Sequence, residues 1–182
     1  GQLCAVIAQT SHYKSGFLHS WERQLANQLM RDGRTDECVV HVSIEESVEE
    51  QGILMLAIES GEDSQKLARG DVMDWAKLKR AAVTIGTVPI FRIGDALARP
   101  EDSPHLYMSN MIRAVHYLES KDKVVENRLF RDKPLKIAAL FFDYLQAFPF
   151  DPEHRVPGND QRRLQVRDDI YRLRQASLLF NC

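Results

Sequence analysis

The sequence has few cysteines, no long apolar segment and no clear metal-binding pattern. Its three cysteines, Cys4, Cys38 and Cys182, show no CxxC spacing, so they predict neither a disulfide framework nor a zinc site. The six histidines likewise show no metal-like pairing along the chain. No apolar run approaches the ~20 residues that cross a bilayer, and the N-terminus lacks the regions of a signal peptide. We therefore expect a cytoplasmic protein in a reducing compartment, without membrane contact.

An excess of charge of either sign is also absent. The 24 basic and 26 acidic residues leave a formal net charge of −2, and only a strongly basic balance would indicate nucleic acid. The 182 residues, 44% of them hydrophobic, are sufficient for one domain with a core. Because residues 178–182 read as an apolar helix end with no strand after it, we expect one domain over residues 1–182 that is truncated on its C-terminal side.

Short apolar runs alternate with helical patterns along the chain. Strands are expected at residues 3–8, 38–42, 88–93 and 136–142, since continuous apolar runs of this length are typical of strands buried on both faces. Helices are expected at residues 14–31, 47–60, 71–85 and 108–118, and residues 61–71 are expected to form a loop. A final helix should bury Val166, Ile170, Leu173, Ser177 and Phe180. This alternation predicts an α/β fold with a mainly parallel sheet flanked by helices.

The segment after the first expected strand has the position and length of a phosphate-binding loop. Residues 8–15 read Ala-Gln-Thr-Ser-His-Tyr-Lys-Ser and lead into a helix. A Walker A loop, GxxxxGK[ST], needs N–H groups at a helix start, a lysine for the phosphates and a hydroxyl for Mg²⁺. Lys14 and Ser15 supply the last two, but Ala8 and Tyr13 replace the glycines. The alternative reading of this pattern alone is a surface Lys-Ser at a helix start.

The strand expected at residues 136–142 ends in an acid, Asp143. An apolar strand that ends in aspartate is the Walker B arrangement, in which the carboxylate orients Mg²⁺. An aspartate at a strand end is also a common turn cap.

The sequence Asp143-Tyr144-Leu145-Gln146 after an apolar strand resembles the Walker B segment of DnaB-type replicative helicases. Other segments resemble that family in the same order along the chain. They are residues 8–17 (its Walker A, with glycine at the position of Tyr13), Ser43-Ile44-Glu45 (its Ser-Leu-Glu), the residues Leu67, Gly70, Asp74-Trp75 and Leu78 (its helix and turn before the third strand), Pro89-Ile90-Phe91 and residues 162–174. The resemblance covers nearly all 182 residues and implies a RecA-like P-loop ATPase core.

The resemblance also implies a function and its residues. The expected protein is a motor that uses ATP and Mg²⁺ to move along single-stranded DNA as a hexameric ring of identical subunits. Lys14 would neutralise the phosphates, Ser15 and Asp143 would hold Mg²⁺, and Glu45 would polarise the attacking water. The nucleotide-binding loop would comprise Gln9, Thr10, Ser11, His12, Tyr13, Lys14 and Ser15.

Alternatives remain for two of these groups. Glu45 and Glu46 also fit a solvated acidic turn. Arg155 and Arg162 are the arginines nearest the loop that would grip DNA, but a helix surface where arginines pair with Asp160, Asp168 and Asp169 is the alternative.

Departures from the family pattern favour other functions. Tyr13 places a β-carbon and a ring where a glycine normally lets the backbone approach phosphate, which favours a degenerate ATPase that acts as a scaffold. Residues 95–107 and 120–134 are longer than the family's usual connections, so they predict a surface for protein partners. They favour an ATPase that serves a non-helicase partner in mobile-element or defence biology. The family's sensor glutamine and basic finger fall beyond residue 182.

Overall fold

The computed structural model describes Cys4 and residues 14–44, 46–71, 74–94, 108–119, 135–143 and 161–179. The side chains at positions 111, 114, 117–119, 161 and 162 are outside this description. In chain order the elements are α1 (Lys14–Arg31), β1 (Glu37–Ser43), α2 (Val48–Ser60), α3 (Ser64–Arg69), α4 (Trp75–Ile85), β2 (Ile90–Gly94), α5 (Met108–Glu119), β3 (Lys136–Asp143) and α6 (Gln161–Leu179).

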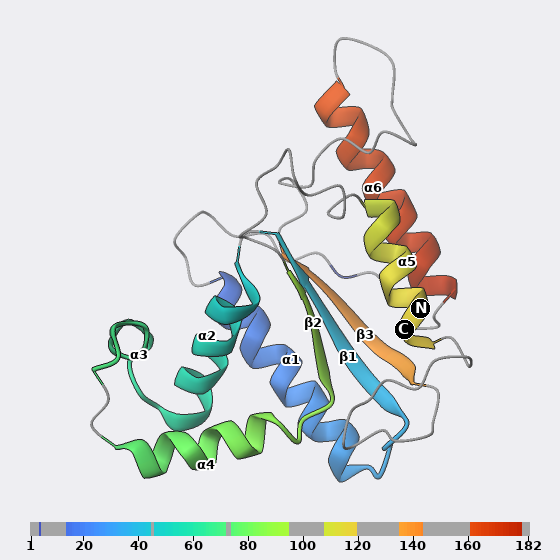
Figure 1. The fold of residues 1–182 in the computed structure, drawn as a ribbon. Coiled ribbons are helices and arrows are strands. Elements are labelled where there is room, and N and C mark those ends of the chain that lie inside the picture. Colours follow the sequence, from blue (N-terminus) through green and yellow to red (C-terminus); the bar gives the residue numbers. More distant parts are fainter. Residues whose placement is uncertain are drawn as a thin grey trace.

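The three described strands form an all-parallel sheet in the order β2-β1-β3 (Figure 1). At its carboxyl edge, Ser43 of β1 lies opposite Gly94 of β2 and Asp143 of β3. The sequence prediction of a parallel α/β sheet is confirmed. Open sheets of this kind bind ligands at the carboxyl ends of their strands, so this edge is where a site is expected.

Helices cover both faces of the sheet. Cys38, Val40 and Val42 of β1 are buried against residues of α5 and α6, whereas Val39 packs in a second core cluster with Leu29 of α1. Figure 1 shows α1 on one side of the sheet and α5 with α6 on the other. The alternation of side chains along a strand produces this division. Odd-numbered residues of β1 therefore face α1.

Helix α1 carries the candidate phosphate-binding residues into contact with the sheet. Leu18, Ala26 and Leu29 recur at helical spacing and are buried, with Leu29 fully so. The helix ends where expected, because Gly33 takes the left-handed conformation (φ 69°) that glycine adopts without steric cost. Since α1 begins at Lys14, this lysine lies in the first turn of the helix.

The start of α2 fixes the chain just after β1. The Ser47 hydroxyl accepts the backbone N–H of Glu50 at 3.1 Å, and the Glu50 carboxylate accepts the N–H of Ser47 at 2.8 Å. This reciprocal capping box satisfies two backbone donors that a helix start would leave open. The start of α2 is therefore fixed at Ser47, shortly after the end of β1 at Ser43.

Two predicted boundaries are wrong in the region after α2. The expected loop at residues 61–71 contains the short helix α3, which Asp63 caps and Gly70 (φ 77°) ends. The helix expected from Asp71 begins instead at Trp75, because Asp74 accepts the N–H of Lys77 at 2.9 Å as its N-cap. Helix-capping residues set both boundaries, and the spacing of apolar residues does not reveal them.

The buried face of α6 also differs from the expected stripe. Ile170 is 42% exposed, whereas Gln165 and Asp169 are buried. The Gln165 amide donates to the Asp169 carboxylate at 2.8 Å. The apolar pattern could not indicate this polar pair, although it correctly identified Leu173 as buried.

Three segments for which the sequence makes predictions lie outside the described residues. The strand expected at residues 3–8 lies outside the described residues except for Cys4, which is exposed and belongs to no strand. The segments 95–107 and 120–134 also lie outside them. Within the described ranges, no helix is both long and apolar enough to cross a membrane.

Candidate functional site

Three side chains that the sequence selected meet at the carboxyl edge of the sheet. The Lys14 ammonium lies 2.7 Å from one oxygen of the Asp143 carboxylate, and the Ser15 hydroxyl donates to the other at 2.9 Å. Asp143 is 1% exposed, and its backbone carbonyl accepts the N–H of Ile44 at 3.1 Å. The first turn of α1 and the end of β3, 128 residues apart in sequence, therefore form one polar centre.

The segment between β1 and α2 adds a second carboxylate to this centre. We call residues 44–47 the acidic turn. The backbone N–H of Glu46 donates to the Ser43 hydroxyl at 3.1 Å, and its carbonyl accepts the Gln51 side chain at 3.1 Å. Its carboxylate lies 2.9 Å from Nε2 of His19. Glu46 is thus hydrogen-bonded through its backbone N–H, its backbone carbonyl and its side-chain carboxylate.

The electrostatic surroundings keep the Glu46 carboxylate ionised. Burial raises its pKa, but the hydrogen bond and charge of His19 and the nearby Ser15 hydroxyl lower it more, so the pKa lies below its ordinary value. The single hydroxyl proton of Ser15 is donated to Asp143, and Glu46 lies close to the same hydroxyl.

The remaining predicted site residues lie outside the described part of the chain. They are Glu45, Arg155 and the loop residues Gln9, Thr10, Ser11, His12 and Tyr13. Arg162 belongs to α6, but its side chain is not described. The roles assigned to these residues stay predictions.

Beneath the acidic turn lies a group of ionisable side chains, most of them buried, that the sequence did not reveal. We call His19 and Glu22 of α1, His41 of β1 and Arg92 of β2 the buried ionic cluster. One Glu22 oxygen lies 2.9 Å from His19 Nδ1 and 2.6 Å from Arg92 Nη2, and the other lies 2.5 Å from His41 Nδ1. His19, Glu22 and His41 are fully buried.

Two sequence features could have pointed to this cluster. Ser15, His19 and Glu22 are spaced four and three residues apart, which places them on one face of a helix. His41 stands between valines in the otherwise apolar run of residues 38–42. A polar residue inside such a strand requires a buried partner.

Protonation in the cluster follows from its contacts. Burial raises the pKa of Glu22, but hydrogen bonds from His19 and His41 and the charge of Arg92 hold it well below its usual range. Burial lowers the pKa of His19, but hydrogen bonds to Glu22 and Glu46 raise it more, so its pKa lies above the ordinary value. An ionised carboxylate only accepts hydrogen bonds. Both ring nitrogens of His19 face carboxylates and therefore carry protons, so the ring is an imidazolium.

The cluster is a hydrogen-bonded ion network rather than a metal cage. His19, Glu22 and His41 offer ligand atoms within 4.8 Å of one another, which is compatible with a cation. However, the contacts of 2.5 and 2.9 Å between Glu22 and the two rings are hydrogen-bond distances, shorter than the separation of two ligands ~2.0–2.2 Å from one zinc ion. The rings also stack nearly parallel, with centroids 4.8 Å apart and an interplanar angle of 13°. Arg92 already supplies the positive charge.

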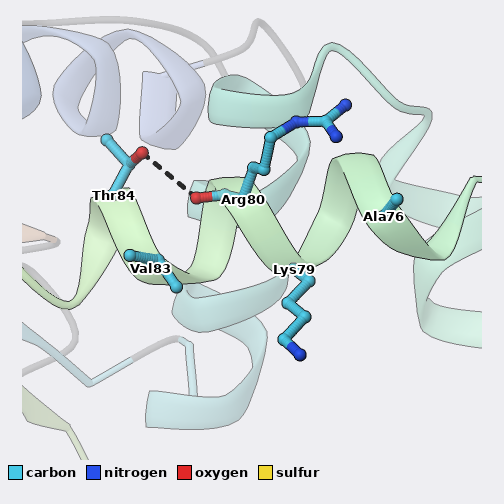
Figure 2. A pocket seen from close by; sticks show the side chains of 5 residues that line it. All are labelled: Ala76, Lys79, Arg80, Val83 and Thr84. Atoms are coloured by element: carbon cyan, nitrogen blue, oxygen red, sulfur yellow. Dashed lines mark hydrogen bonds between the residues drawn. The ribbon is translucent and has the colours of Figure 1, made fainter.

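A surface hollow elsewhere carries none of this chemistry. Figure 2 shows that its lining comes from the single helix α4, where the Thr84 hydroxyl bonds to the Arg80 carbonyl. The helix leads into the amino end of β2, away from the edge where Lys14 and Asp143 meet. We therefore place the candidate site at the carboxyl edge.

The fold and this centre define a class: a parallel α/β domain with a lysine, a hydroxyl and a carboxylate at the carboxyl edge of its sheet. Solved structures share the fold. A DnaB-like replicative helicase, studied with its interactions with primase, superposes with a TM-score of 0.65 and 17% sequence identity over 93% of this chain. A second solved structure, that of an ATPase domain, superposes with a TM-score of 0.61 and 17% identity over 94% of this chain.

These similarities establish that the chain shares the fold that the sequence resemblance implied. The chain spans 35% of the length of the first matched chain and 51% of the second. No protein-family model and no curated protein sequence matches the chain.

Replacing Glu22 should expose the dependence of the fold on the buried ionic cluster. Glu22→Gln leaves the Arg92 guanidinium and the His19 imidazolium without their buried counter-charge, so the free energy of unfolding should fall by about 3–5 kcal/mol. Urea unfolding would measure this loss. The matched control is Glu59→Gln on α2, which removes the partner of Arg23 from an ion pair that is more exposed than Glu22 and should cost about 1 kcal/mol or less. Equal losses in the two variants would contradict the prediction.

The pH dependence of the wild type has a defined sign. Because the pKa of His19 is raised, its contribution to stability is complete below the ordinary histidine value of about 6.5 and is lost as pH rises through the folded-state pKa. Because the pKa of Glu22 is lowered, its contribution is present above the ordinary glutamate pKa and is lost progressively as the pH falls from that value through the folded-state pKa. In Glu22→Gln the alkaline loss should begin at lower pH.

Proposed function

We propose that this chain is the ATP-hydrolysing motor of a DnaB-type helicase, which moves along single-stranded DNA as a ring of identical subunits in the cytoplasm. The observation that carries the proposal is the meeting of Lys14, Ser15 and Asp143 at the carboxyl edge of the sheet. Solved helicase ATPase domains share this fold. The ring, the DNA and the replication role rest on the family resemblance.

The residues present fit a magnesium nucleotide. Mg²⁺ prefers oxygen ligands, and the Ser15 hydroxyl and Asp143 carboxylate are oxygen donors already 2.9 Å apart. The Lys14 ammonium is a mobile point charge suited to phosphate oxygens. Bound Mg²⁺ would neutralise charge on the phosphates. Lys14 and Ser15 would hold the phosphate end, together with the loop at residues 9–13.

The acidic turn supplies the carboxylate needed to orient an attacking water. The family resemblance assigns this role to Glu45. Glu46, the next residue of the acidic turn, lies close to Ser15 of α1. Phosphoryl transfer depends on positioning and on charge stabilisation rather than on covalent catalysis. In the proposed ring, a neighbouring subunit would contribute a further positive charge.

Contacts outside the described residues complete the proposal. Arg155 and Arg162 would bind the DNA backbone, since a basic groove that follows phosphates is the general device for single strands. Residues 95–107 and 120–134 would bind protein partners.

Lys14 should be required for nucleotide binding. Lys14→Ala removes the charge that faces the phosphates, so the affinity for a non-hydrolysable ATP analogue in Mg²⁺ should fall by about 10- to 100-fold, the value of a charged hydrogen bond. Isothermal titration calorimetry measures it. Lys79→Ala in the hollow of α4 is the control and should bind as wild type does. Absence of binding by the wild type would favour the degenerate, scaffolding ATPase that Tyr13 suggests.

The acidic turn should control turnover without controlling binding. Glu45→Gln should lower ATP hydrolysis by about 10²-fold or more, the scale of a lost general base, while the analogue still binds. Glu46→Gln keeps an oxygen that can accept from His19, so its loss should be smaller. The ATPase rates of the two variants, measured side by side, assign the base. If only Glu46→Gln loses turnover, the base lies one residue later than the resemblance implies.

Single-stranded DNA should bind with strong salt dependence, because contacts to phosphates release counterions. Changing Arg155 and Arg162 together to alanine should lower the slope of log affinity against log salt by up to ~2 units. Fluorescence anisotropy over a salt series measures the slope. The matched control changes Arg69 and Arg80, both exposed on α3 and α4, and should leave it unaltered. An unaltered slope in the first variant would support helix-surface pairing of these arginines.

A further inference from the structure

The face of α1 that begins at Ser15 also carries the residue that holds the acidic turn. Ser15 and His19 are separated by four residues in one helix, so their side chains lie on the same face. Ser15 contacts Asp143 and Glu46, and His19 contacts Glu46 from beneath. The turn is therefore bound to the helix that carries the candidate phosphate-binding residues.

His19 can make this link because its other nitrogen is fixed. Nδ1 donates to Glu22 at 2.9 Å while Nε2 donates to Glu46 at 2.9 Å. Glu22 is in turn held by His41 of β1 and Arg92 of β2. The ring therefore has one orientation, and the carboxylate of Glu46 is bound to a support formed by one helix and two strands.

Charge balance favours this arrangement. The imidazolium and the guanidinium of Arg92 offset the carboxylates of Glu22 and Glu46. The groups that face His19 are Glu22 on its own helix, Glu46 in the acidic turn and His41 on β1, with Arg92 of β2 acting through Glu22. Removing the proton from His19 would bring a bare ring nitrogen against a carboxylate, and the link would be lost.

We propose that His19 is a positioning residue which, as an imidazolium, ties the acidic turn to α1 and so fixes the Glu46 carboxylate relative to Ser15. The inference rests on the proposed ATPase function. It adds a residue for which that function alone gives no role, and it makes turnover depend on one buried proton. His19 itself touches neither Lys14 nor Asp143 among the contacts described.

The test compares His19→Ala, which removes the link, with His19→Gln, which keeps an uncharged donor. Exposed His116→Gln on α5 is the matched control. In His19→Ala, kcat for ATP should fall by about 10- to 100-fold, the effect of misplacing a catalytic group. The KM for ATP should change little, because Lys14, Ser15 and Asp143 remain. Wild-type kcat should decline as the pH rises through the His19 pKa, and this decline should be absent in His19→Gln.

A second measurement separates this inference from the proposed function. Backbone hydrogen exchange in residues 44–47 should quicken in His19→Ala and change less in His19→Gln, whether or not the protein hydrolyses ATP. Unchanged exchange in a folded His19→Ala protein overturns the link. Quicker exchange with wild-type kcat and pH profile overturns its role in turnover. If the wild type hydrolyses no ATP, the proposed function fails and the role in turnover fails with it. Backbone hydrogen exchange then tests only whether His19 holds the acidic turn.

Discussion

The buried carboxylate of Glu22 is shared by three donors, and the arrangement of the chain around the site depends on that sharing. His19 reaches it from the same helix, His41 from the central strand and Arg92 from an edge of the described sheet. A charge placed in a protein interior is costly unless it is paired and hydrogen-bonded. Here the cost is offset by contacts that also fix the orientation of α1 against the sheet, and α1 is the helix that begins with Lys14.

The site follows from this support. Parallel strands bring Ser43 and Asp143 to one edge, and α1 brings Lys14 and Ser15 to the same edge. The capping box at Ser47 then directs the chain away within a few residues, so the acidic turn stays over the buried ionic cluster. The polar groups of the site and those of the buried ionic cluster form a chain of neighbouring side chains from Asp143 through Ser15, Glu46, His19 and Glu22 to Arg92.

Local patterns predicted the layers but not the contacts between distant elements. Apolar runs such as residues 38–42 correctly indicated strands, and the spacing of Leu18, Leu25 and Leu29 correctly indicated α1. The short helix α3 was missed because its ends depend on Asp63 and Gly70 rather than on buried side chains. The buried ionic cluster was missed because its members come from three elements. Only the register of the strands, which places His41 opposite Arg92, brings them together.

The buried ionic cluster also limits how this sequence can change over generations. Loss of any single member leaves a neighbouring charge stranded in the interior, whereas replacing the whole group by apolar side chains of similar volume can be close to neutral. The fully charged and the fully apolar combinations are thus both stable, whereas sequences with only one or two of the four residues replaced are unstable. Positions 19, 22, 41 and 92 should therefore be inherited as a unit, with mixed combinations rare.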